Sequence, residues 1–261
     1  MSKTTKAVLI TGAGARVGRH LAKGLAADGW TVVVHYNRSK DGAEKLVAEI
    51  AKAGGKAAAV QANLFVPDDV DSLIPRAAAA LNTPLTALIN NASTFVNDTA
   101  ADFTRAGFDH HMEVNLRAPL LLTQYFADHL SESQKGCVIN LLDQRMLKPN
   151  PLFFTYAISK SGLFWATKTL AQTLAPRIRV NAIGPGPTLE NIHQQDGEFA
   201  AERAATLLGE GSPPETILDA ARYLLSASAV TGQMIAVDGG QHLTWETPDV
   251  ITRMPKPNDG A

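Results

Sequence analysis

Short apolar runs and longer amphipathic segments alternate along the whole chain. The apolar runs predict strands at 7–10, 31–36, 57–61, 85–90, 137–142, 177–183 and 234–237. Apolar residues at helical spacing predict helices at 17–28, 41–53, 68–81, 108–130 (one or two helices), 154–174 and 214–226. Parallel strands need crossover connections, which helices supply on both faces of a sheet. This order therefore predicts a doubly wound α/β fold.

Two segments fall outside this alternation. Residues 184–211 form a long stretch that is rich in Gly and Pro at its start, and residues 244–261 form a polar tail. No Pro/Gly/Ser linker divides the rest, so we expect one domain over residues 1–243 followed by a C-terminal tail over 244–261. The sequence assigns no role to the tail or to residues 189–211.

Composition narrows the classes of protein. A 45% hydrophobic fraction supports a large core, and a net charge of −1 argues against a general nucleic-acid or membrane-surface binder. No apolar run approaches the ~18 residues that span a bilayer. The single cysteine, Cys137, excludes an intrachain disulfide and fits a reducing, cytoplasmic compartment; we expect it in the core. His110, His111, His193 and His242 lack metal-ligand spacing, so we expect surface or loop histidines and no metal.

A glycine-rich turn follows the first predicted strand. It reads TGAGARVG from residue 11, with Gly12, Gly14 and Gly18, and it opens a helix. Small residues let the backbone approach a diphosphate, and the helix N-terminus presents free N–H groups and a partial positive charge. The turn predicts a dinucleotide site; a plain tight turn is the alternative.

The end of the second strand indicates which nucleotide binds. A site for an unphosphorylated ribose usually carries Asp or Glu here, whereas residues 35–40 read HYNRSK. Arg38 is suited to a 2′-phosphate, with Ser39 and Lys40 adding donors. The pattern favours NADPH; a solvated basic loop is the alternative.

Four further motifs follow in order: NNAS at 90–93, an asparagine at 115, YAISK at 156–160 and NAIGPG at 181–186. With the glycine turn, this set resembles the short-chain dehydrogenase/reductase family over roughly residues 6–243. The resemblance implies a Rossmann-type domain with a seven-stranded parallel sheet, and a homotetramer that forms through the helix at 154–174.

Tyr156 and Lys160 are the candidate proton-transfer pair. Their i, i+4 spacing places them on one helix face, where the ammonium is expected to lower the phenol pKa and make a general acid. Such pairs are common on helices, so this pair is a candidate only because it lies within the ordered set of motifs. Asn115 resembles the family asparagine that helps to hold a water relay behind the lysine.

Asp143 departs from the family pattern, because a serine usually stands thirteen residues before the tyrosine. At about 4 Å and an effective dielectric near 20, its carboxylate would oppose a ketone-derived alkoxide by roughly 4 kcal/mol. A C=N acceptor ends neutral after protonation, so Asp143 favours that chemistry. Loss of catalytic function is the alternative.

Two other departures accompany it. Arg16 replaces the usual middle glycine of the turn and is expected to point toward the diphosphate or the substrate, or else to be merely exposed. Residues 93–95 read STF where the family usually has glycine after Asn-Asn-Ala. Phe95 is placed to stack a flat heterocycle against the nicotinamide, with a core or lid phenylalanine as the alternative.

The three departures together resemble the pteridine reductase branch of the family, with the related bacterial dihydromonapterin and dihydrofolate reductases. This resemblance implies a small pterin- or folate-type substrate, NADPH as cofactor, and catalytic Asp143, Tyr156, Lys160 and Asn115. The implied substrate-binding residues are Arg16, Ser93, Phe95, Asp143 and Tyr156. The implied cofactor-binding residues are Gly12, Gly14, Arg16, Val17, Gly18, His35, Tyr36, Asn37, Arg38, Ser39, Asn63, Leu64, Asn91, Ala92, Ser93, Tyr156, Lys160, Pro185 and Gly186.

Asn63 departs even from this branch, which usually has an aspartate against adenine, so we expect rearranged adenine contacts. Three hypotheses for function follow. The first is NADPH-dependent C=N reduction of a pteridine-like substrate. The second is a general carbonyl or 3-oxoacyl reductase, and the third is an NADPH-binding sensor without turnover. The sequence does not identify the physiological pterin or the reduction step.

Overall fold

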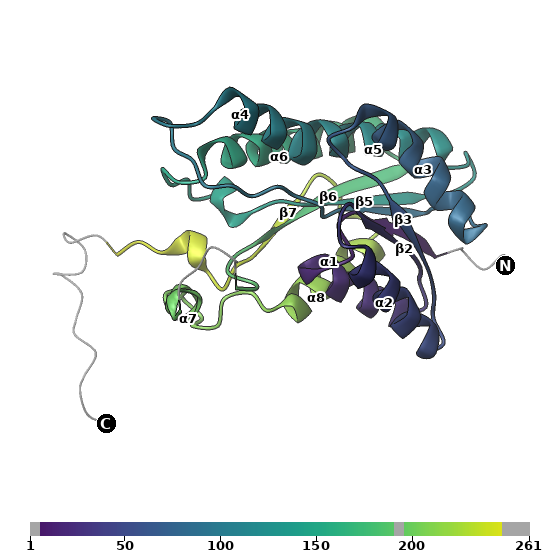
Figure 1. The fold of residues 1–261 in the computed structure, drawn as a ribbon, viewed down its shortest axis with the longest axis horizontal. Helices are drawn as coiled ribbons and strands as arrows, with labels where there is room; N and C mark the ends of the chain where they lie inside the picture. Colours follow the sequence, from purple (N-terminus) through teal and green to yellow (C-terminus); the bar gives the residue numbers. More distant parts are fainter. Residues whose placement is uncertain (1–5, 191–195, 247–261) are drawn as a thin grey trace.

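The computed structural model describes residues 6–190 and 196–246. Its seven strands are β1 (Ala7–Ile10), β2 (Thr31–Tyr36), β3 (Lys56–Gln61), β4 (Ala87–Asn90), β5 (Gly136–Leu141), β6 (Ile178–Pro185) and β7 (Met234–Val237). They form one parallel sheet in the order β3-β2-β1-β4-β5-β6-β7 (Figure 1). The predicted Rossmann-type α/β fold is confirmed, and strand ends differ from the predicted ones by at most two residues.

Helices cover both faces of the sheet (Figure 1). One face carries α1 (Arg16–Ala27), α2 (Lys40–Lys52) and α8 (Pro214–Ser226), and the other carries α3 (Pro67–Leu81), α4 (Arg105–Met112), α5 (Ala118–His129) and α6 (Phe154–Leu174). Successive side chains of a strand point to opposite faces, so Ala7 and Leu9 join one core and Val8 and Ile10 the other. All four residues are fully buried, which explains why β1 reads as a continuous apolar run.

The segment predicted as one or two helices at 108–130 is continuous but irregular. A π-helical turn, Glu113–Arg117, joins α4 to α5. Such turns are rare and occur mostly at functional sites. This one holds Asn115, which is completely buried.

The long segment after β6 contains an unpredicted short helix, α7 (Glu198–Ala204). The chain after β7 makes a 3-10 turn, Gln241–Leu243, and Lys148 Nζ donates to the Thr244 carbonyl at 2.8 Å. The remainder of the predicted tail lies outside the described residues. Among the helices that are described, none is long and apolar enough to cross a membrane.

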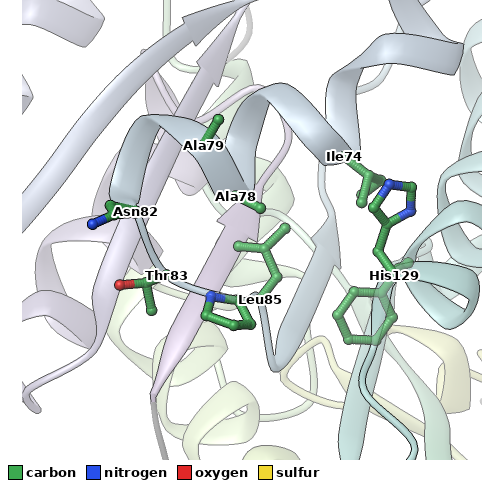
Figure 2. Close-up of a pocket in the computed structure, with 9 residues that line it drawn as sticks. Ile74, Ala78, Ala79, Asn82, Thr83, Leu85 and His129 are labelled. Atoms are coloured by element: carbon green, nitrogen blue, oxygen red, sulfur yellow. The ribbon is translucent and has the colours of Figure 1, made fainter.

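The sheet order reverses direction between β1 and β4, so the loops that leave their carboxyl ends diverge and open a crevice, as in other open α/β sheets. At the other end of these strands, a cavity of about 340 Å³ lies between α3 and α5, against residues that precede β4 (Figure 2). Its lining is largely apolar and includes Ile74, Leu85 and Phe126. The polar motifs of the sequence lie at the crevice, not at this cavity.

Candidate active site

The glycine turn forms a tight backbone cradle at the crevice. Gly12 has a positive φ of 65°, which glycine adopts without strain. A Cβ on Gly18 would lie 2.5 Å from the Gly12 carbonyl oxygen, so only glycine lets α1 start this close to the turn. The N-terminus of α1 therefore lies beside the turn, and a diphosphate at this place stays a prediction.

His35 supports this turn from beneath. Its buried ring accepts a hydrogen bond from Gly12 N–H at Nδ1 (2.9 Å) and donates from Nε2 to the Ala62 carbonyl (3.1 Å). Burial lowers the pKa of His35 to about 4, so the ring is neutral. Both ring nitrogens are engaged inside the protein, so the side chain supports the turn, and a contact of His35 with the cofactor stays a prediction.

Arg16 has a positive φ of 51°, which explains why glycine is usual at this position. The left-handed conformation costs a residue with a Cβ roughly 1–2 kcal/mol. Its exposed guanidinium donates to the carbonyls of Leu189 (3.1 Å) and Glu190 (2.8 Å). In this structure Arg16 therefore joins the turn to the segment after β6; its contact with diphosphate or substrate stays a prediction.

Thr11, which was not among the predicted cofactor residues, connects the turn to the segment after β4. Its Oγ1 accepts from the N–H groups of Asn91 and Ala92, both at 2.9 Å. Asn91 Nδ2 donates in return to the Thr11 carbonyl at 2.8 Å. The position of Thr11 between the first predicted strand and Gly12 is a signal that could have identified it.

The end of β2 presents exposed polar groups beside the turn. Within the described part of the chain, no hydrogen bond or ion pair engages the exposed Arg38 guanidinium, whereas Lys40 lies 3.7 Å from Glu44. Asn37 Nδ2 donates to Asn63 Oδ1 at 3.4 Å, which joins the ends of β2 and β3. Leu64 is buried in the core, so only its backbone is available to a nucleotide.

The segments after β6 and β7 close the other side of the crevice. Pro185 ends β6, and a Cβ on Gly186 would lie 2.8 Å from the Asp238 Cα. Val17 is partly buried in the first turn of α1. These positions agree with a backbone role next to a bound nucleotide, which stays a prediction.

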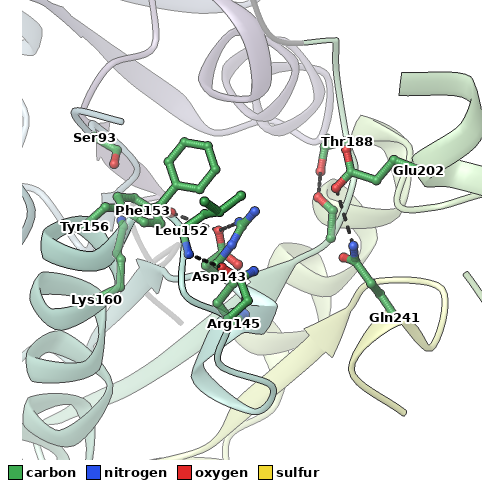
Figure 3. A network of polar contacts seen from close by, with 12 residues as sticks. Ser93, Asp143, Arg145, Leu152, Phe153, Tyr156, Lys160, Thr188, Glu202 and Gln241 are labelled. Carbon is green, nitrogen blue, oxygen red and sulfur yellow. Dashed lines mark hydrogen bonds and ion pairs between the residues drawn. The ribbon is translucent and has the colours of Figure 1, made fainter. Parts of the chain in front are cut away.

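Tyr156, Lys160 and Asp143 meet at the carboxyl end of the sheet (Figure 3). Tyr156 Oη donates to Asp143 Oδ2 at 3.0 Å. Lys160 Nζ donates to the Leu141 carbonyl at 2.7 Å and lies 5.9 Å from the Tyr156 ring centre. Tyr156 and Lys160 are buried, whereas Asp143 is partly exposed. The structure thus brings the predicted trio together, with Tyr156 hydrogen-bonded to the Asp143 carboxylate and Lys160 to the backbone of β5.

The pKa of Tyr156 is shifted in the direction opposite to the predicted one. Burial, and after it the Asp143 charge, raises the pKa of Tyr156 well above 10, while Arg145 acts in the opposite direction. The predicted lowering of this pKa by Lys160 is therefore wrong, because burial and the carboxylate outweigh the ammonium. Burial also lowers the pKa of Lys160 to about 8. Tyr156 thus holds its proton at neutral pH, as a proton donor must.

Asn115 holds the segment after β4. Its Oδ1 accepts from Thr94 N–H (2.9 Å) and Ser93 Oγ (3.1 Å). Its Nδ2 donates to the Thr94 carbonyl (3.0 Å) and to Ser159 Oγ (3.1 Å) on α6. The π-helical turn thereby positions Ser93 beside the catalytic helix; a role for Asn115 in proton relay stays a prediction.

Phe95 lies in an aromatic cluster beside Tyr156. Its ring stacks on Phe153 with centroids 4.1 Å apart, and it meets the Tyr156 ring edge-on at 4.7 Å. The Arg145 guanidinium lies 5.0 Å from the Phe153 centroid. Phe153 and Arg145 were not predicted site residues, because their proximity depends on the loops that precede α6.

His111 is buried, which corrects its predicted surface position. Nε2 accepts from Val96 N–H at 3.3 Å and Nδ1 donates to Thr155 Oγ1 at 2.7 Å. Thr155 in turn donates to Asp98. His111 therefore fastens the loop that carries Phe95 to the start of α6. Cys137 is a core residue as predicted, and burial raises its pKa to about 11.

No cluster of His, Cys, Asp or Glu that could hold a metal occurs in residues 6–190 and 196–246. Of the other predicted histidines, His110 is exposed and lies 4.9 Å from the Phe65 ring, and His242 is paired with Asp238 at 2.7 Å. His193 lies outside the described residues.

The chain matches the short-chain dehydrogenase family over residues 6–200. The structure of FolM alternative dihydrofolate reductase 1 from Brucella canis, complexed with NADP, is 42% identical with a TM-score of 0.90, covering 94% of this chain and 97% of that one. The 3beta-hydroxysteroid dehydrogenase 1 of Eggerthella lenta is 35% identical over 91% of this chain and 94% of its own. The 3-oxoacyl-[acyl-carrier-protein] reductase of Synechocystis sp. is 32% identical over 91% and 97%.

Fold, glycine turn, and the Tyr156–Lys160 pair together define an NAD(P)-dependent reductase. The chain belongs to the short-chain dehydrogenase/reductase family.

Proposed function

We propose that this protein is an NADPH-dependent reductase that reduces a C=N bond of a pteridine-type heterocycle. The observation that carries the proposal is the Asp143 carboxylate, which accepts hydrogen bonds from both Tyr156 Oη and Arg145 Nη1 at 3.0 Å. A carboxylate in this position opposes alkoxide formation and attracts N–H groups. The 42% identity to a FolM dihydrofolate reductase supports the same substrate class.

We propose that NADPH binds in the crevice, where the backbone of Gly12, Gly14 and Gly18 approaches the diphosphate. The close packing of Gly18 against the Gly12 carbonyl supports this, because it holds the N-terminus of α1 beside the turn. Arg38 and Ser39 would hold the 2′-phosphate, which matches a guanidinium that no other described residue engages. Lys160 would hold the nicotinamide ribose. NADPH, when bound, supplies the hydride.

The chain's own residues supply binding and proton transfer. Phe95 stacks on one face of the heterocycle, and Ser93, held by Asn115, offers a hydroxyl at its edge. Asp143 accepts hydrogen bonds from amino or ring N–H groups. The Tyr156 hydroxyl then gives its proton to the ring nitrogen, and the buried Lys160 ammonium stabilises the negative charge that develops on the phenol.

The test is oxidation of NADPH at 340 nm with dihydropterin and dihydrofolate, alongside simple ketones and a 3-oxoacyl thioester. Turnover of the dihydropterin or dihydrofolate is expected. Turnover of ketones without any pterin-dependent loss of absorbance would overturn the proposal and support a general carbonyl reductase, the second candidate. That candidate is favoured by the 3-oxoacyl and steroid activities named for relatives at 32% and 35% identity. Tight NADPH binding without turnover of any substrate would overturn the proposal and support the third hypothesis, an NADPH-binding sensor.

The proposal extends to assembly and location. We propose a homotetramer that packs through α6, because Trp165 on this helix is 70% exposed. Sedimentation of the wild-type protein and of Trp165→Glu tests the assembly. A cytoplasmic location stays a prediction.

A further inference from the structure

We infer that Arg145 is a positioning residue that couples the hydrogen-bonding and stacking parts of the substrate pocket. The inference rests on the proposed function for its substrate. Arg145 follows Asp143 by two residues in the 3-10 turn Gln144–Met146, and its side chain is 17% exposed.

Arg145 holds both oxygens of Asp143. Its backbone N–H donates to Oδ1 at 2.9 Å, and its Nη1 donates to Oδ2 at 3.0 Å. Oδ2 is also the acceptor of the Tyr156 hydroxyl. Arg145 therefore determines the direction in which the carboxylate faces the catalytic hydroxyl.

The same guanidinium contacts the aromatic cluster. Its Cζ lies 5.0 Å from the Phe153 centroid and 5.7 Å from that of Phe95, within the range of cation–π attraction. Phe153 packs face to face on Phe95, so Arg145 and Phe153 together limit the positions of the Phe95 ring. Among the hydrogen bonds, ion pairs and ring contacts of the described residues, only those of Arg145 and Tyr156 join Asp143 to Phe95.

The arrangement is not one that stability alone explains. The Arg145 Nε is buried and has no hydrogen-bond partner in the structure. An unsatisfied buried donor destabilises the fold, and a residue that serves only structure would not be expected to carry that cost. The groups that face Tyr156 are Asp143, Arg145, Lys160 and His111, and the Arg145 charge offsets the effect of the carboxylate on the phenol.

The test compares Arg145→Met, which keeps the length of the side chain but not the charge, with Arg145→Lys, which keeps the charge but not the planar fork. The surface variant Arg222→Met is the matched control, because Arg222 lies on α8 outside the site and pairs with Asp28 and Asp219. Values of kcat and KM are measured for each variant, with melting curves and NADPH affinity to establish folding.

For Arg145→Met we expect a kcat at least about tenfold lower and a raised KM for dihydropterin, because Asp143 loses the group that orients it toward Tyr156 and Phe95 loses its support. Arg145→Lys should recover most of kcat but not KM, since the charge beside Asp143 returns without the planar contact on Phe153. Wild-type kinetics in Arg145→Met would overturn the inference. Equal losses of kcat and equal rises of KM in both variants would also overturn it, because that pattern indicates a structural role.

Absence of dihydropterin turnover in the wild type would overturn the proposed function instead. The same comparison is then made with whichever carbonyl substrate the wild type reduces. Tyr156 donates the proton in that reaction as well, so the recovery of kcat in Arg145→Lys remains the deciding result.

Discussion

The hydroxyl of Tyr156 donates to Oδ2 of Asp143 over 3.0 Å, so the proposed proton donor of this reductase is hydrogen-bonded to a carboxylate. A serine hydroxyl in the same place would assist negative charge on a substrate oxygen. The carboxylate opposes such charge and attracts N–H donors instead. This one contact accounts for the proposed preference for C=N over C=O substrates.

Replacing Asp143 by serine is expected to reverse that preference. Activity with dihydropterin should fall and activity with ketones should rise, so that the ratio of the two kcat/KM values changes about 100-fold, or roughly 2.7 kcal/mol. The measurement is NADPH oxidation with both substrates. A parallel loss of both activities would contradict the assignment of Asp143 as the residue that selects the substrate.

Arg38→Ala is expected to weaken NADPH binding by about ten- to a hundredfold while leaving NADH binding unchanged. The physical reason is loss of the guanidinium that matches a 2′-phosphate. Titration of each nucleotide by fluorescence checks this. Lys40→Ala is the control, and its effect should be smaller because Lys40 already lies beside Glu44. An unchanged preference for NADPH in Arg38→Ala would show that the 2′-phosphate binds elsewhere.

His35 predicts a dependence of stability on pH. Its pKa is about 4 in the folded protein and near 6.5 in the unfolded chain, so the unfolded state binds more protons between these values. The contribution of neutral His35 is therefore complete above pH 6.5 and is lost as the pH falls toward 4. Unfolding in urea at pH 7.5 and 5 should show a loss of about 2 kcal/mol from this group.

His35→Asn should remove most of that loss, because its amide can accept from Gly12 N–H but does not titrate. The exposed His20→Asn is the control and should keep the wild-type dependence. If His35→Asn kept the wild-type dependence on pH, another group would have to be responsible for it.

Lys160→Met should abolish turnover and yet stabilise the fold at neutral pH. Lowering the Lys160 pKa from 10.5 to about 8 corresponds to a cost of about 3 kcal/mol for the buried ammonium. The variant also loses the hydrogen bond to the Leu141 carbonyl, which costs about 1 kcal/mol. The free energy of unfolding should therefore rise by about 2 kcal/mol.

This gain should shrink as the pH rises through 8, because the wild-type lysine then folds without its charge. Urea unfolding at pH 7 and 9.5 measures both effects. A variant that is less stable than the wild type at pH 7 would mean that the ammonium stabilises the fold.

The order of strands and helices was readable from the sequence, because burial on both faces of a parallel sheet produces apolar runs such as residues 31–36. The candidate catalytic trio could also be predicted from the sequence, since Tyr156 and Lys160 are one helical turn apart and Asp143 stands thirteen residues before Tyr156. Both kinds of signal depend on spacing along the chain, which the sequence contains directly.

Only the tertiary structure decided which groups surround those residues. His35 was predicted to meet the nucleotide, yet it is buried beneath the turn by the pairing of β2 with β1 and β3. The raised pKa of Tyr156 depends on its burial and on the distance to Asp143, which no spacing rule contains. Arg145 and Phe153 join Phe95 only because the loops after β4 and β5 meet at the start of α6. Contacts between segments far apart in the chain are set by packing, and sequence spacing does not encode them.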